Sequence, residues 1–191
     1  MTVAAGLLQR SRIGASLTQA ALGTLARIPQ SSIARAESGD QGLTVATLDR
    51  LVRAAGFRLT VIPTRGVTAA DAAESVVEYL ATHNEDGPYR SVIQLADDLA
   101  REHGAERVAL TVTPPQPTGD IRYDAFIAGV VETRLDEERL PHPVWLATAA
   151  RLNPPWFVDP WSTGDPPTIE ATPDPLRERG VIIDAAELVS A

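Results

Sequence analysis

The stretch SLTQAALGTLARIPQSSIARAESG, residues 16–39, decides the fold of the N-terminal part of the chain. Thr18 is a good N-cap for a helix that runs to about Ala26, because its hydroxyl can accept a backbone N–H of the first turn. Proline is tolerated near the start of a helix and not in its interior, so Pro29 marks the entry to a second helix over 30–38. The stretch therefore predicts two short helices joined by a tight turn.

The flanking sequence completes a small helical domain. Residues 3–13 are predicted to form a helix, because their apolar residues fall on one face. Thr44 is predicted to cap a further helix, whose apolar stripe consists of Leu48, Leu51, Val52 and Ala55. The sequence FRLTVI, residues 57–62, alternates as a strand does. We therefore predict a first domain over 1–65 with a trailing strand, and a boundary in the sequence PTRG.

Residues 66–191 are predicted to form a second domain. Helices are expected over 69–81, with Thr68 as the cap, and over 91–103 and 123–135, and a strand is expected over 107–112. Frequent prolines predict an extended tail between Leu140 and Pro175, held to the domain by the aromatic residues Trp145, Trp156, Phe157 and Trp161. The expected fold class is mainly α, with a small α+β C-terminal part.

Charge divides the chain in the same way. Residues 1–65 carry eight arginines and three acidic residues, a net charge of +5, whereas residues 66–191 carry nine arginines and 22 acidic residues, a net charge of −13. This asymmetry indicates a polyanion as the partner of the first domain alone. The alternative interpretation is that this charge asymmetry arose by chance. The chain has no lysine and is rich in Ala, Gly and Pro, a composition typical of high-GC bacteria, so its arginines need not be functional.

Several function classes have no support in the sequence. The absence of an apolar run of about 18 residues and of a signal-peptide pattern predicts a cytoplasmic protein with no membrane partner. With no cysteine, the chain has no disulfide, thiolate metal site or cysteine nucleophile. Its three histidines, His83, His103 and His142, lack metal-ligand spacing, and no phosphate-binding loop or nucleophile motif is present. We therefore expect no catalytic residue, no metal and no cofactor.

The spacing within residues 16–39 fits two helices that cross at a steep angle. Such a pair needs a small residue where the backbones touch and an apolar residue that fills the angle, and Gly23 and Ile33 supply these. The outer face of the second helix carries short polar side chains that can enter a major groove, namely Gln30, Ser31, Ser32 and Arg35.

These residues resemble the phage-repressor (Xre/Cro-like) helix-turn-helix DNA-binding domains, over residues 3–57. The matched positions are Arg12, Leu17, Thr18, Gln19, Leu22, Gly23, Ile33, Glu37 and Gly39. The resemblance implies a lambda-repressor-like domain of four to five helices. It also implies a sequence-specific transcriptional regulator that binds double-stranded DNA, its own operator, and associates with the nucleoid when bound.

The resemblance also implies DNA contacts. Gln19 would bind a phosphate, whereas Gln30 and Ser31, and Ser32 beside them, would face base edges. Arg35 would reach a base or a phosphate.

Four further positions take roles from the same resemblance. Ser38 would hold the DNA backbone after the recognition helix, and Arg12 and Glu37 would form a structural ion pair. Arg27 stands where the family usually has glycine. Either the turn has another geometry, or the strain of a left-handed arginine is small and Arg27 faces a phosphate.

A single domain of this kind makes few base contacts, so specific binding is expected to require a homodimer on a two-fold operator. Two pairings are open for the predicted strand 57–62. It could pair with its symmetry mate and so set the spacing of the recognition helices, or it could pair with the strand 107–112 of the same chain.

The second domain carries a weaker resemblance. The sequences HPVW, NPPWF and PLRERGVIIDAAEL resemble the C-terminal part of bacterial antitoxins encoded beside nucleotidyltransferase-like toxins. The resemblance implies an antitoxin that represses its own operon and contacts a toxin through Trp145, Trp156, Phe157, Arg177 and Arg179. Alternatively, the tryptophans are simply the core of a small domain. The rival function is a one-component regulator that senses a small molecule in an aromatic-lined pocket, and a third is an enzyme whose titratable cluster only folding would assemble.

Overall fold

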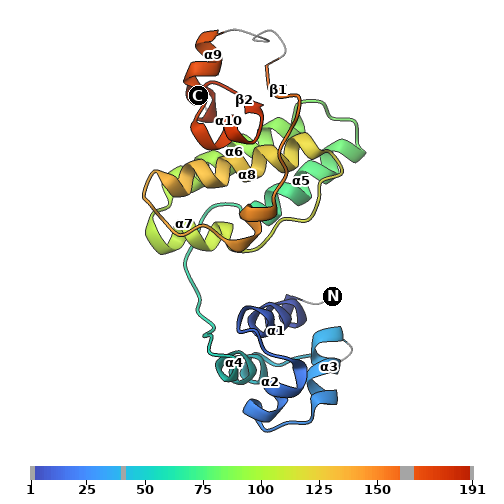
Figure 1. The fold of residues 1–191 in the computed structure, drawn as a ribbon. Coiled ribbons are helices and arrows are strands. Elements are labelled where there is room, and N and C mark those ends of the chain that lie inside the picture. The colour runs from blue at the N-terminus through green and yellow to red at the C-terminus, as the bar shows by residue number, and fades with distance from the viewer. Residues whose placement is uncertain (1–2, 40–41, 160–165, 190–191) are drawn as a thin grey trace. The chain divides into compact units, whose positions relative to one another are not determined.

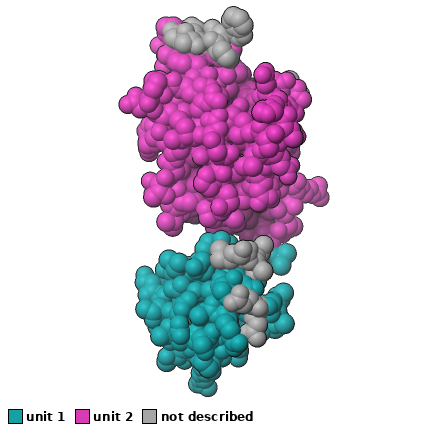
Figure 2. Space-filling view, turned by 90° about the vertical axis from the view of Figure 1, so that its right-hand side faces the viewer, with its two compact units in different colours: residues 1–61 teal, residues 62–191 magenta. Residues whose placement is uncertain are grey.

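The computed structural model describes residues 3–39, 42–159 and 166–189 and is mainly helical, as predicted (Figure 1). The chain divides into two compact units, unit 1 (residues 1–61) and unit 2 (residues 62–191) (Figure 2). Each unit has its own hydrophobic core. The boundary expected from the sequence lies a few residues further along the chain. Among the described residues, no helix has the length and apolarity needed to cross a membrane.

Unit 1 consists of short helices around a shared core. Its helices are α1 Val3–Gly14, α2 Gln19–Ala26, α3 Gln30–Ser38 and α4 Val45–Ala54. The hydroxyl of Thr18 accepts the backbone N–H of Ala21 at 3.1 Å, and that of Thr44 accepts the N–H of Thr47 at 3.2 Å, so both predicted caps are confirmed. The helices bury a common set of side chains, Leu8, Leu22, Ile33, Leu48, Leu51 and Val52.

The strand predicted over 57–62 is wrong. The Phe57 N–H donates to the carbonyl of Val52 at 3.0 Å, and Leu59 packs on the core of unit 1, but Val61 is 96% exposed. These residues therefore continue from α4 as an irregular segment. Within the described part of this single chain, 57–62 does not pair with another segment, and its pairing with a symmetry mate stays a prediction.

The strand predicted over 107–112 is also wrong, because residues 107–111 belong to helix α7, Gly104–Thr111, and Val112 is its C-cap. Its buried residues are Arg107, Leu110 and Thr111, which have the spacing of one helix face. Burial of a helical stripe outweighs the weak β preference of the valines and threonine. The alternative pairing of 57–62 with 107–112 is therefore excluded.

Unit 2 is organised around one buried helix. Its elements are α5 Ala69–Ala81, α6 Gly87–Arg101, α7, α8 Ile121–Asp136, the 3-10 helix η1 Val144–Thr148, β1 Trp156–Phe157, α9 Pro166–Ala171, α10 Asp174–Glu178, β2 Val181–Ile182 and the 3-10 helix η3 Ala185–Leu188. Helix α8 is buried continuously over 125–131, and it packs against α5, α6 and α10 (Figure 1). Thr68 caps α5 as predicted, and the structure adds a reciprocal hydrogen bond from its backbone N–H to Asp71, which completes a capping box.

The tail expected to be extended between Leu140 and Pro175 is only partly so. It contains η1, α9 and α10, because Pro166, Pro167 and Pro175 lie in the first turn of a helix, where the missing N–H is not needed. Trp156 and Phe157 pair in parallel with Val181 and Ile182, and the Trp156 N–H donates to the Gly180 carbonyl at 2.7 Å. Trp161 lies outside the described residues.

Candidate nucleic-acid interface

Helix α3 presents a polar face to solvent. It buries Ile33, Ala36 and Glu37 against the rest of unit 1. The side chains expected to face DNA lie on the other side, with Gln30, Ser31, Arg35 and Ser38 exposed and Ser32 half-buried. Because the exposed residues carry short or flexible polar groups, this face can enter a groove without burying an unpaired apolar side chain.

The turn between α2 and α3 depends on Gly23. The Ile28 N–H donates to the Gly23 carbonyl at 2.9 Å, which folds the chain back over the end of α2. A Cβ atom on Gly23 would lie only 2.8 Å from the Ile28 carbonyl oxygen. A small residue is therefore required where the turn crosses α2, as the spacing predicts.

Arg27 ends α2 in a left-handed conformation, with φ 57° and ψ 44°, at the position where glycine was expected. Its backbone N–H donates to the Thr24 carbonyl at 3.2 Å, and its side chain is exposed. The turn thus keeps the left-handed geometry, and the chain accepts a strained arginine there. An exposed cation beside the start of α3 is well placed to meet a phosphate.

Arg27→Gly is expected to stabilise unit 1. Relief of about 1–2 kcal/mol of left-handed strain outweighs about 0.5–1 kcal/mol of extra chain entropy, for a net gain of about 0.5–1 kcal/mol. Urea unfolding followed by far-UV circular dichroism measures the change. The control Thr24→Gly, at an exposed helical position of the same helix, is expected to destabilise unit 1 by about 0.3 kcal/mol, since threonine is only slightly better than glycine in a helix. Changes of the same sign would contradict the assignment of strain to Arg27.

Arg12 and Glu37 join the first and third helices. Arg12 Nε donates to Glu37 Oε1 at 2.7 Å and Nη2 donates to Oε2 at 3.0 Å, while Nη1 donates to the Leu17 carbonyl at 2.8 Å. The two side chains are 14% and 4% exposed. A bidentate and largely buried pair of this kind fixes the end of α3 against α1.

Two glutamines extend this pair to the surface. Gln19 Nε2 donates to Glu37 Oε2 at 3.0 Å, and Gln30 Nε2 donates to Gln19 Oε1 at 2.8 Å. Gln19 and Gln30 are the first residues of α2 and α3. The set of Arg12, Glu37, Gln19 and Gln30, here called the amide relay, therefore connects the buried ion pair to the exposed start of α3. This link between the glutamines was not foreseen, although both stand first in consecutive predicted helices.

The relay keeps its charges at neutral pH. Burial raises the pKa of the Glu37 carboxyl, but hydrogen bonds from Arg12 and Gln19 and the charge of Arg12 outweigh burial, so the pKa of Glu37 lies below its ordinary value. The hydrogen bond to Glu37 likewise raises the pKa of Arg12. Glu37 is therefore ionised and accepts hydrogen bonds only, which fixes the Gln19 amide with its nitrogen toward Glu37.

The predicted partner contacts of unit 2 are dispersed. Trp145 is half-buried and its indole N–H donates to the Thr111 carbonyl at 2.9 Å. Trp156 packs edge-to-face on Phe126 at 6.0 Å and holds the Arg122 guanidinium 5.5 Å from its ring centre. Phe157 is half-buried in β1, and the exposed Arg177 pairs with Asp174. Both tryptophans pack on the core of unit 2 and keep only part of their surface for a partner.

Arg179 is not a surface contact, which corrects the expectation from the sequence. Its side chain is 1% exposed and donates to Glu132 Oε2 from Nε at 2.8 Å. Its other nitrogens donate to three backbone carbonyls, those of Leu146 at 3.0 Å, Ala150 at 3.3 Å and Ala149 at 3.4 Å. A buried guanidinium needs this many acceptors, and it ties α10 to α8 and to the end of η1.

Comparisons with known proteins do not assign the chain to a family. No protein-family model matches the chain, and neither a curated protein nor a solved structure is similar to it. The function is therefore argued from the residues themselves and from their geometry.

Proposed function

We propose that the chain is a DNA-binding transcriptional regulator in which α2 and α3 form a helix-turn-helix and α3 enters the major groove. One observation carries the proposal. The exposed polar face of α3 begins at Gln30. The side chain of Gln30 is held by its hydrogen bond to Gln19, which is part of the amide relay. A base-reading side chain held in one rotamer loses less entropy on binding than a free one.

Gln30 is suited to read adenine. Its Nε2 gives one hydrogen to Gln19, so a second hydrogen and the Oε1 acceptor remain for a base. These two groups match N7 and the N6 amino group of adenine in the major groove. Ser31 and Arg35 lie on the same exposed face and extend base recognition along α3.

The phosphate contacts are proposed for the residues around the turn. Gln19 keeps one Nε2 hydrogen beyond the relay. Arg27 is exposed in the turn before α3, and Ser38 is exposed as the last residue of α3. Contacts of this type position the protein on DNA and carry no sequence information. We further propose that the regulator works in the cytoplasm as a homodimer on a two-fold operator, with half-sites about 34 Å apart.

Selection from a randomised duplex library by the full chain tests the proposal. We expect a preferred sequence that contains adenine in each half-site. Gln30→Ala and Arg35→Ala are each expected to weaken binding to that sequence by about 1–3 kcal/mol and to relax the preference at one base position. Arg27→Ala is expected to weaken binding to all duplexes alike and to reduce the salt dependence by about one charge.

The matched control is Arg53→Ala. Arg53 is exposed on α4 and paired with Asp49, so its removal takes away one charge without touching α3. The variant is expected to keep the sequence preference. If the full chain selects no sequence, or if Gln30→Ala and Arg53→Ala have equal effects, base reading by α3 is wrong.

The antitoxin role of the second domain stays a prediction. The net charge of −13 over residues 66–191 supports a basic protein partner. Arg179, however, leaves the proposed contact set because it is buried. Of the five predicted contacts, Trp145, Trp156, Phe157 and Arg177 retain exposed surface.

A further inference from the structure

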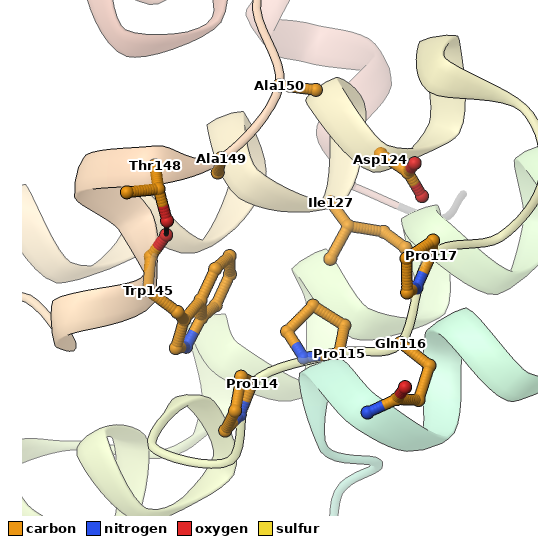
Figure 3. Close-up of a pocket in the computed structure, with 10 residues that line it drawn as sticks. All are labelled: Pro114, Pro115, Gln116, Pro117, Asp124, Ile127, Trp145, Thr148, Ala149 and Ala150. Carbon is orange, nitrogen blue, oxygen red and sulfur yellow. Dashed lines mark hydrogen bonds between the residues drawn. The ribbon is translucent and has the colours of Figure 1, made fainter. Parts of the chain in front are cut away.

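Unit 2 contains a hollow of about 370 Å³, lined in part by Trp145, which is also one of the predicted toxin contacts (Figure 3). Three segments form its walls: the proline-rich loop 114–117 between α7 and α8, Asp124 and Ile127 of α8, and η1 with the residues that follow it. Its volume lies in the range of small-molecule sites. Like most such sites, it is lined mainly by apolar side chains and has few polar groups.

The apolar part of the wall suits a flat ring. Trp145 is anchored by its indole hydrogen bond to the Thr111 carbonyl, so the faces of its ring and not its N–H are left for a ligand. Figure 3 shows Trp145 at one side of the hollow, with Pro115 and Ile127 beside it. Rigid proline and anchored tryptophan surfaces are already ordered before binding, which favours an aromatic ligand.

The polar part of the wall suits a cation. Among the described lining residues, Asp124 is the one with a charge. Its Oδ1 accepts the backbone N–H and the hydroxyl of Thr118, both at 2.8 Å, so the carboxylate is held in place. Oδ2 accepts no hydrogen bond from the residues that the structure describes. Figure 3 places Asp124 on the side of the hollow away from Trp145.

We propose that this hollow binds a small organic cation with an aromatic body, of the arylalkylamine class. The ring lies against Trp145 and Ile127, and the ammonium group binds Asp124 at the other side. The net charge of −13 over residues 66–191 attracts cations and disfavours carboxylate ligands of the same shape. The inference does not depend on DNA binding by unit 1, since its test measures binding to the hollow alone.

Three probes of equal ring and similar length test the proposal on the full chain: phenethylamine, the neutral 2-phenylethanol and the anion 3-phenylpropionate. Isothermal titration gives the affinities. We expect phenethylamine to bind about tenfold or more tightly than either analogue, because only its ammonium group carries a positive charge that pairs with the Asp124 carboxylate. In a ¹⁵N-labelled chain, phenethylamine is expected to shift the indole signal of Trp145, identified by its loss in Trp145→Phe.

Two pairs of variants locate the site. Asp124→Asn keeps the acceptor for Thr118 and removes the charge. It is therefore expected to weaken the binding of phenethylamine about tenfold and to leave the affinity for 2-phenylethanol unchanged. Glu74→Gln, on an exposed position of α5, is its charge control. Thr148→Phe fills the hollow and is expected to abolish binding, whereas Ala147→Phe, at the neighbouring exposed position outside the hollow, is not.

The outcomes are distinct. Failure of phenethylamine to bind, equal binding of 3-phenylpropionate, or binding that Thr148→Phe leaves intact would each overturn the proposal. An equal loss in Asp124→Asn and Glu74→Gln would overturn the role of Asp124 and with it the cation specificity.

Discussion

Arg179→Met is expected to destabilise unit 2 by about 3 kcal/mol, because it breaks an ion pair whose guanidinium is buried and whose Glu132 carboxylate is 21% exposed. The substitution leaves Glu132 without the guanidinium that neutralises it. It also removes the donors to the carbonyls of Leu146, Ala149 and Ala150. Each orphaned acceptor adds to the loss where water does not replace the donor.

Tryptophan fluorescence during urea unfolding measures this effect in the intact chain. All three tryptophans lie beyond residue 140, so the signal reports unit 2 and not unit 1. The matched control is Arg177→Met, two residues away. Arg177 is exposed and paired with Asp174, and exposed pairs contribute about 0–1 kcal/mol.

The double variant Arg179→Met with Glu132→Gln separates the charge from the packing. It is expected to be more stable than Arg179→Met alone, because the amide leaves no unpaired carboxylate. Equal stabilities for Arg177→Met and Arg179→Met would show that the buried guanidinium does not hold α10 against α8.

The sequence predicted most reliably what is encoded locally. Thr18, Thr44 and Thr68 cap the helices assigned to them, since a hydroxyl next to its own first turn needs no tertiary contact. The two predicted strands failed for the opposite reason. A run of β-branched residues over 107–112 also contains a helical stripe, and only packing in unit 2 selects the helix.

The residues that were misassigned depend on contacts between distant segments. Arg179 looks like an exposed anchor in a charged stretch, but it is buried because Glu132, far earlier in the chain, lies opposite it. The hollow likewise combines Asp124 of α8 with Trp145 of η1. Neither pairing follows a sequence period, so no local pattern could have revealed it. In unit 1 the resemblance supplied the pairing of Arg12 with Glu37 but not its extension through the glutamines.

Arg12→Met is expected to destabilise unit 1 by about 3 kcal/mol, because Glu37 remains buried with Gln19 as its remaining side-chain donor. The pH dependence identifies the cause. In the unaltered chain the pKa of Glu37 is lowered on folding, so its contribution is complete above the unfolded pKa of about 4.3 and is lost as the pH falls through the folded pKa.

In Arg12→Met the contribution of Glu37 to the pH dependence of stability reverses its sign. Burial, now opposed mainly by Gln19, places the pKa of Glu37 above its unfolded value, so the variant gains stability as the pH falls from 7 toward 5. Far-UV circular dichroism follows both units and tryptophan fluorescence follows unit 2, so their difference isolates unit 1. Adding Glu37→Gln to Arg12→Met is expected to remove the gain. If Arg12→Met instead loses stability in acid in parallel with the unaltered chain, Arg12 is not what lowers the pKa of Glu37 in the amide relay.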